Sequence, residues 1–192
     1  IRYMRETENQ LQILLCELAA YLHNKDMEIN VWDRIIAFEG RMHEFIKAAY
    51  DYQDNTFHSH PGYYIDYFEM RLAQLQVLHN LHYEIKKIRK MPKQALVIAD
   101  YIMYMADYVV EMNIPDQQIE KLEEISEQMK QEELPKTREE FEGRALLYHI
   151  LMDLEEFLVY KKRFVSGLDE KKLRIYWKQE MEQKDSANEL QK

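Results

Sequence analysis

The sequence predicts an all-α fold, a single-domain helical bundle of about six helices with short connections. Only four of its 192 residues are Gly and four are Pro, whereas 46% are hydrophobic and 32% are charged. Apolar residues recur at helical spacing over long segments, and helix breakers are rare, so helices are favoured over strands. The chain is long enough for one domain with a sizeable core. We expect the bundle at residues 1–182 and a frayed polar tail at residues 183–192.

Two helices are expected in the first part of the chain, over residues 2–24 and 31–52. In each, apolar side chains recur on one helix face. The inward face of the first helix comprises Leu11, Leu14, Leu15, Leu18 and Leu22. The inward face of the second comprises Trp32, Ile35, Met42, Phe45, Ile46 and Ala49. The polar residues 24–30 predict a turn between them, and residues 53–60 predict a loop after the second helix.

A third helix is expected over residues 61–90, because Pro61 suits a first helical turn and Pro92 cannot continue a helix past residue 90. Its inward stripe comprises Tyr64, Phe68, Leu75, Leu78 and Ile85. A fourth helix runs from there until Asn113 and Pro115 end it. Its inward residues are Ile98, Ile102, Met105, Val109 and Met112, and its opposite face carries Asp100, Asp107 and Glu111.

Two shorter helices are also expected, and the first of them is expected at the periphery of the bundle. One covers residues 116–133 and is strongly acidic, and few apolar positions anchor it. These are Ile119, Leu122, Ile125 and Met129. The other covers residues 168–182, with apolar contacts from Leu173, Tyr176, Trp177 and Met181.

The most strongly marked helix covers residues 134–167, and we expect it to lie at the centre of the bundle. Pro135 blocks a helix arriving from upstream, and Thr137 with Glu140 forms a capping box. Gly167 is placed to take the left-handed conformation that often ends a helix. Two apolar stripes indicate that this helix packs against more than one neighbour. One stripe comprises Phe141, Ala145, Tyr148, Met152 and Val159, and the other comprises Leu147, Ile150, Leu151, Leu154, Phe157 and Leu158.

Composition excludes several classes of function. The formal charge is -9, so no basic surplus is available to neutralise the phosphates of a nucleic acid. The single cysteine, Cys16, allows no internal disulfide and lies in an apolar run, so we expect a buried, inert thiol. No segment is long and apolar enough to span a bilayer. The chain starts with Ile1 rather than Met, and we expect a longer protein to extend upstream.

Two arginines are expected in unusual surroundings. Arg71 falls inside the apolar arc of the third helix, and Arg144 has a similar setting in the capped helix. One interpretation is that both take part, with Asp153, in structural ion pairs that hold the bundle in register, because a buried guanidinium needs an acceptor. The other is that one of them binds the carboxylate of a small ligand in a pocket lined by Tyr64 and Tyr67. The sequence leaves both open.

The histidines raise the alternative of a metal site. Possible ligand pairs are His79 with His82, Glu39 with His43, and His58 with His60. The di-iron carboxylate pattern requires Glu-x-x-His on two helices, which this chain lacks. We therefore expect no metal and no other cofactor, and we interpret His82 as a hydrogen-bonded core or boundary residue. No phosphate loop and no Gly-rich turn around a Ser is present, so the sequence does not predict an enzyme.

Two stretches resemble a known family. Residues 61–78, PGYYIDYFEMRLAQLQVL, and residues 134–158, LPKTREEFEGRALLYHILMDLEEFL, are similar to the soluble C-terminal domain of the bacterial aromatic acid exporter family. The resemblance implies membrane helices upstream, in the same protein, and a cytoplasmic location for this domain. It would place Arg2 and Arg5 just inside the cell membrane, as the positive-inside tendency expects. The family supplies no catalytic residues to carry over.

The resulting prediction is a non-catalytic cytoplasmic domain that serves assembly, gating or sensing in a bacterial membrane transporter for aromatic acids. Its expected partners are the membrane-embedded N-terminal part of the same protein and a second copy in a homo-oligomer. The alternative is a stand-alone helical sensor that binds a small aromatic carboxylate through an Arg/Tyr pocket. A helical-bundle metalloenzyme is the third and weakest hypothesis.

Overall fold

The computed structural model describes the whole chain except residues 1, 26–29, 56–60 and 178–192, and its described part is all-α. The helices are α1 Arg2–His23, α2 Val31–Asn55, α3 Pro61–Lys87, α4 Ala95–Ala106, α5 Asp116–Lys130, α6 Arg138–Ser166 and α7 Glu170–Tyr176. No strand occurs within these ranges. The predicted fold class is therefore confirmed, and each of the seven helices in the described ranges corresponds to a segment that the sequence predicts as a helix. Among the described helices, none has an apolar stretch that would reach across a bilayer.

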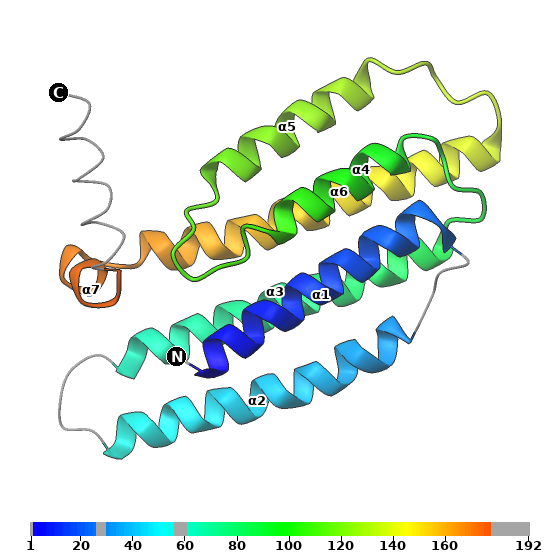
Figure 1. The fold of residues 1–192 in the computed structure, drawn as a ribbon. Coiled ribbons are helices and arrows are strands. Elements are labelled where there is room, and N and C mark those ends of the chain that lie inside the picture. The colour runs from blue at the N-terminus through cyan, green and yellow to red at the C-terminus, as the bar shows by residue number, and fades with distance from the viewer. Residues whose placement is uncertain (1, 26–29, 56–60, 178–192) are drawn as a thin grey trace, which may run out of the picture.

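The long helices lie side by side, with α2 at one edge of the bundle and α5 at the other (Figure 1). Helix α3 packs against α1, α2 and α6, whereas α6 packs against α3 and α5. Helix α3 is thus central, and the capped helix α6 lies between α3 and α5 rather than at an edge of the bundle. Helix α3 is buried over most of its circumference. Its buried residues include Met70, Arg71, Gln74, Leu75, Val77, Leu78, Leu81, His82 and Ile85.

The N-terminus of α6 forms as its sequence predicts. The Thr137 hydroxyl accepts a 3.2 Å hydrogen bond from the Glu140 N–H, and the Glu140 carboxylate accepts a 2.8 Å bond from the Lys136 N–H. The C-terminus differs from the prediction. Gly167 has φ −79°, in the right-handed region, and its N–H reaches the Arg163 carbonyl at 3.1 Å. The expected left-handed residue is wrong because Gly167 continues the right-handed turns of α6, and the chain becomes extended only at Asp169, the N-cap of α7.

The two apolar stripes of α6 have different environments. Every residue of the broader stripe is buried; these are Leu147, Ile150, Leu151, Leu154, Phe157 and Leu158. In the other stripe, Phe141 and Met152 are each 63% exposed and Ala145 is exposed as well. Helix α6 thus contacts its two neighbours through the broader stripe and leaves much of the second uncovered.

Four further details differ from the sequence expectations. Helix α2 continues to Asn55, and α4 ends at Ala106, well before the expected end near residue 112. The Glu111 side chain is half-buried and turned toward α3 rather than facing solvent on the far side of a helix. Cys16 is exposed, so the expectation of a buried thiol is wrong. It belongs to an apolar run, but its position on α1 points away from the face that buries Leu14, Leu15 and Leu18.

Candidate functional site

The interior of the bundle holds a charged and hydrogen-bonded cluster centred on Arg71 of α3. This side chain is 1% exposed. Its Nε donates a 3.0 Å hydrogen bond to the Tyr67 hydroxyl, and its Nη1 donates a 2.9 Å bond to Oε1 of Gln74. Its Nη2 lies 3.6 Å from the carboxylate of Glu8, which belongs to α1. The guanidinium carbon also lies 5.0 Å from the Tyr67 ring centroid, a cation–π contact.

The hydrogen bonds of the cluster join three helices. The Tyr67 hydroxyl donates a 2.9 Å hydrogen bond to Glu8, which links α3 to α1. The Gln74 amide donates a 2.9 Å bond to the Phe157 carbonyl, which links α3 to α6. Burial is the main cause that raises the pKa of the Tyr67 phenol, so this group remains a neutral donor. A buried guanidinium keeps its proton, and these acceptors are what allow it to lie in the core.

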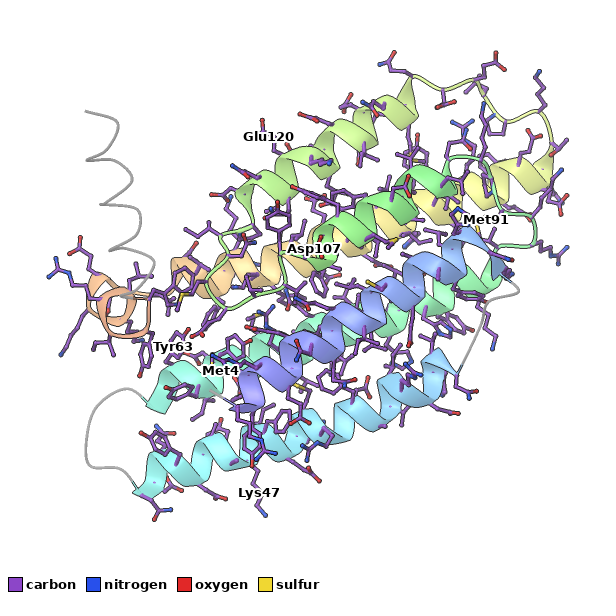
Figure 2. All side chains as sticks on the ribbon, viewed as in Figure 1. Met4, Lys47, Tyr63, Met91, Asp107 and Glu120 are labelled. Carbon is purple, nitrogen blue, oxygen red and sulfur yellow. The ribbon has the colours of Figure 1, made fainter. Side chains whose placement is uncertain are left out.

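A second polar group extends from Tyr63, near the start of α3 and beside α7 (Figure 2). The Tyr63 hydroxyl donates a 2.6 Å hydrogen bond to Glu111 and accepts a 3.1 Å bond from the indole N–H of Trp177. The ring of Tyr176 stacks on that of Tyr63 with centroids 3.9 Å apart. Burial is the largest cause that raises the pKa of the Glu111 carboxyl, and the hydrogen bond from Tyr63 opposes it.

Lys161 of α6 is buried, with 4% of its surface exposed. Its ammonium donates to the carbonyls of Val110 and Glu111 at 2.7 and 2.6 Å. These carbonyls belong to the turns after α4, and the Val110 carbonyl also accepts a 3.3 Å hydrogen bond from the Asn113 N–H. Lys161 therefore fixes the α4–α5 connection against α6.

Tyr64 does not join Tyr67 and Arg71. It is half-buried and contacts Tyr52 of α2 and Tyr176 of α7, with ring centroids 6.2 and 5.6 Å apart. It lines a groove of about 390 Å³ with six other residues. These are Tyr3, Phe45, Ala48, Ala49, Tyr52 and Phe68. The groove is aromatic, and none of its lining residues carries a charge.

Arg144 lies elsewhere, at the end of the bundle where the α3–α4 and α5–α6 connections meet. Its guanidinium donates to the Glu133 carbonyl and to the Met129 carbonyl, the latter at 3.5 Å. It therefore caps the C-terminal end of α5 through main-chain acceptors, where a cation also suits the helix dipole. It lines a cleft of about 290 Å³ together with Lys90, Lys93 and other residues of the two connections.

Asp153 lies on α6 and is half-buried, and it does not meet either arginine. Within the described ranges, no cation lies at ion-pair distance from it. Its pKa is raised to about 6, mainly by burial and then by the nearby Glu84 of α3, while His149 opposes the rise. His149 itself lies 3.9 Å from the Glu84 carboxylate. The structure thus brings Arg71 and Tyr67 together and leaves Tyr64, Arg144 and Asp153 at three other places, so one shared Arg/Tyr pocket is not formed.

The histidine pairs considered as metal ligands lie apart from the Arg71 cluster. His79 pairs with Glu39 of α2 at 3.4 Å and packs edge-on against Trp32. His82 is 1% exposed, near the Tyr21 ring. His58 and His60 fall outside the described residues. In the parts of the chain that the structure describes, no three His, Cys, Asp or Glu side chains converge as a metal site would require.

Sequence reasoning missed Glu8, Gln74 and Lys161 as interior polar residues. Helical spacing relative to apolar residues marks two of them, Glu8 and Lys161, as interior. Glu8 lies between Met4 and Leu11 on the buried face of α1, and Lys161 continues the buried stripe of α6 at the spacing of Phe157. Gln74 lies one helical turn after Arg71, and no pattern marked it as that side chain's partner.

The sequence of this helical domain matches a known protein family. Residues 1–162 match the family described as "Putative aromatic acid exporter C-terminal domain". The chain belongs to this family. The match covers α1 to most of α6, including Glu8, Arg71 and Lys161, whereas α7 lies beyond it. The exporter-family assignment made from the two sequence stretches is therefore confirmed.

This domain is similar to a curated bacterial protein and to a solved structure. The chain is 26% identical over 166 residues to "Uncharacterized protein YqjA" of Bacillus subtilis (strain 168), covering 85% of this chain and 51% of that protein. The chain thus spans about half the length of this curated relative. It also resembles a crystal structure titled "putative membrane protein" from Clostridium difficile 630, with a TM-score of 0.74 and 24% identity. That match covers 85% of this chain and 96% of the other, and it shows a common fold.

Proposed function

We propose that this domain is a non-catalytic cytoplasmic accessory module of a bacterial membrane exporter for aromatic acids, acting in assembly, gating or sensing. The membrane-embedded N-terminal part of the same protein is its proposed partner. Family membership and the length of the YqjA relative, of which the chain covers 51%, support this proposal. A membrane part upstream would join the bundle through α1.

The observation that carries the proposal is the link from α1 to the bundle core. Glu8 of α1 accepts the hydrogen bond of Tyr67 and faces Arg71, and the same cluster reaches α6 through Gln74. A force or displacement on α1 is therefore transmitted to buried groups of α3 and α6. The polar interior is engaged in joining helices, which suits a module that relays or receives conformational change.

The test uses the full-length protein that contains this domain, expressed in cells whose own copy of the gene is deleted. Export of a panel of aromatic carboxylates is compared between the intact protein and one that ends before residue 1 of this chain. Loss of export, or loss of the protein from the membrane, is expected. A reporter fused after residue 192 should be active only on the cytoplasmic side. A truncated protein that exports and accumulates normally would contradict the accessory role, and an external reporter would contradict the location.

A second candidate function is sensing of a small aromatic carboxylate, and the groove around Tyr64 favours it. Five of its seven lining residues are aromatic, namely Tyr3, Phe45, Tyr52, Tyr64 and Phe68. A planar ring can stack among them. The guanidinium of Arg41 lies 4.8 Å from the Phe45 ring centroid, and a bound carboxylate would compete there with Glu6 and Glu44, which pair with Arg41 at 2.8 Å. This site replaces the Arg71 pocket in that hypothesis, because Arg71 is enclosed in the core.

Thermal denaturation with benzoate-like and indole-like carboxylates tests the sensor hypothesis. A ligand that binds only the folded state raises Tm as its concentration exceeds Kd. The increase should be lost in Tyr64→Ala and kept in Tyr83→Ala, which removes an exposed tyrosine elsewhere on α3. An unchanged Tm at saturating ligand would exclude sensing through this groove.

A further inference from the structure

Helix α6 carries an apolar stripe that the bundle leaves largely uncovered. We call it the outer stripe, and it consists of Phe141, Ala145, Tyr148, Met152 and Val159. Met152 lies at its middle and is 63% exposed, as is Phe141 near its start. The positions succeed one another at intervals of four, three, four and seven residues, which is the heptad spacing of a helix–helix seam. Phe141, Ala145 and Met152 are exposed, whereas Tyr148 and Val159 are half-buried. Exposed apolar residues aligned on one face of a helix indicate a surface that binds another helix.

One flank of the outer stripe carries polar side chains at intervals of seven residues. These are Glu142, His149, Glu156 and Arg163, and all four are exposed. They lie on the same side of the stripe because seven residues make nearly two helical turns. Along the helix, an acidic residue stands at the start of the flank and a basic residue at its end.

We propose that the outer stripe is the docking site for a second copy of this chain, with the two α6 helices packed antiparallel and Met152 facing Met152 of the other copy at the two-fold axis. In this arrangement, a residue that lies a given number of positions before Met152 faces the residue that lies the same number of positions after Met152 in the other copy. Ala145 then lies opposite Val159, so that small and branched apolar residues alternate along the seam. The dimer has an isologous interface, the commonest kind in symmetric proteins.

Charge complementarity selects this occupant and this direction. In the antiparallel pair, Glu142 of one copy lies nearly opposite Arg163 of the other, and His149 lies nearly opposite Glu156. Each pair occurs twice, once on either side of the axis. In a parallel pair, by contrast, each of these side chains would lie on the other side of the seam from its own copy, so neither pair would form. The helix is therefore complementary to its own reversed copy.

The size of the seam also suits a dimer. From Phe141 to Arg163 the helix rises about 33 Å at 1.5 Å per residue. The groove beside Phe141 and Ala145 extends this surface toward Lys87 and Arg89 at the end of α3. Both faces of the interface are present in the described chain, so the proposal does not depend on the exporter function.

Sedimentation equilibrium of the 192-residue protein, up to millimolar concentration, tests the proposal. The wild type should be a dimer, and Met152→Glu should raise its dissociation constant at least tenfold by setting two carboxylates at the axis. Met103→Glu is the matched control, because Met103 is a 53% exposed methionine on α4. It should leave the dimer intact. Both variants should keep the Tm of the wild-type fold at a concentration where each is monomeric.

Charge exchange and cross-linking test the direction of the helices. Glu142→Arg should weaken the dimer, and adding Arg163→Glu to the same chain should restore it. In a Cys16→Ser background, Met152→Cys should form a disulfide-linked dimer on mild oxidation. Glu155→Cys should not, because its two copies would stand about 9 Å apart along the helix axes.

A wild type that stays monomeric at millimolar concentration would overturn the proposal. So would a dimer that Met152→Glu leaves unchanged, since another surface must then form it. Cross-linking of Glu155→Cys in preference to Met152→Cys would also overturn it, by showing a different register. None of these results bears on whether the domain serves an exporter, because that test uses the full-length protein and measures export.

Discussion

The Tyr67 hydroxyl accepts a hydrogen bond from Nε of Arg71, one turn further along α3, and the two side chains are both buried. The same hydroxyl donates to Glu8, so it lies between the guanidinium and the carboxylate. A neutral phenol in this position fixes the direction of both charged groups without adding a charge of its own. Glu8, Tyr67 and Arg71 therefore form one hydrogen-bonded unit, and the effects of replacing its members on stability should not be additive.

Replacement of Arg71 by Met should lower the free energy of unfolding by about 3 kcal/mol, because Glu8 and Gln74 lose their partner in a buried setting. Glu8→Gln should also destabilise, because it leaves a buried guanidinium without its countercharge. The double variant should be less destabilised than the sum of the two single variants. Urea denaturation of the four proteins measures this coupling.

The matched control is Arg41→Met. Arg41 also connects two helices, since it contacts Glu6 of α1 at 2.8 Å, but its side chain is 47% exposed. Its loss should cost much less than that of Arg71, because water screens an exposed ion pair. Equal losses for Arg41→Met and Arg71→Met would contradict a special role for the buried cluster.

Tyr63→Phe should reduce stability by about 1–3 kcal/mol, because one hydroxyl serves both Glu111 and Trp177. The loss of the donor should also raise the pKa of Glu111 further. Emission of Trp177, recorded in a Trp32→Phe background, should shift to longer wavelength if the indole loses its anchor. Tyr83→Phe, which removes an exposed hydroxyl on the same helix, should change stability by no more than about 0.5 kcal/mol. An unshifted emission with unchanged stability would show that Tyr63 does not hold α7.

Helical periodicity was enough to predict the fold class, the order of the helices and the cap at Thr137. It could not rank the helices by centrality. Helix α3 is buried over most of its circumference, and the buried side chains include the polar residues Arg71, Gln74 and His82. The buried surface of α3 is therefore wider than its apolar stripe. The sequence of α6 has clearer stripes because one side of the helix stays exposed.

The candidate site was predicted only in part, for a physical reason. The unusual position of Arg71 can be inferred from its helix face alone, but its partner Glu8 is distant in sequence and meets it only through the packing of α1 on α3. Arg144 has a similar local pattern, yet it binds main-chain carbonyls, which no side-chain pattern can mark. Tertiary contacts decide which arginine becomes part of the core.

Two glycines in helices should respond oppositely to replacement by alanine. A Cβ at Gly40 of α2 would meet no atom within 4 Å, so Gly40→Ala should stabilise by about 1 kcal/mol through helix propensity. A Cβ at Gly143 of α6 would lie 3.1 Å from Cγ of Pro92 and 3.3 Å from the Lys90 carbonyl oxygen. Because the connection must move to admit it, Gly143→Ala should destabilise. Thermal unfolding of both variants is the measurement, and a gain in Tm at Gly143 would show that the connection is not packed as described.

Asp153 should make stability depend on pH. Its pKa is raised from 3.8 to about 6 in the folded state by burial and by Glu84. The folded state therefore binds a proton more tightly than the unfolded chain, and this contribution to stability is complete below about pH 4 and lost as pH rises through about 6. Asp153→Asn should gain about 1 kcal/mol at pH 7, a modest figure because the carboxyl is only half-buried, and nothing at pH 3.5. Glu84→Gln should also reduce the pH dependence, since it removes the second cause of the raised pKa. Chemical denaturation from pH 3.5 to 7.5 measures how the free energy of unfolding changes with pH. If the stability of Asp153→Asn falls with rising pH as steeply as that of the wild type, other groups cause the pH dependence.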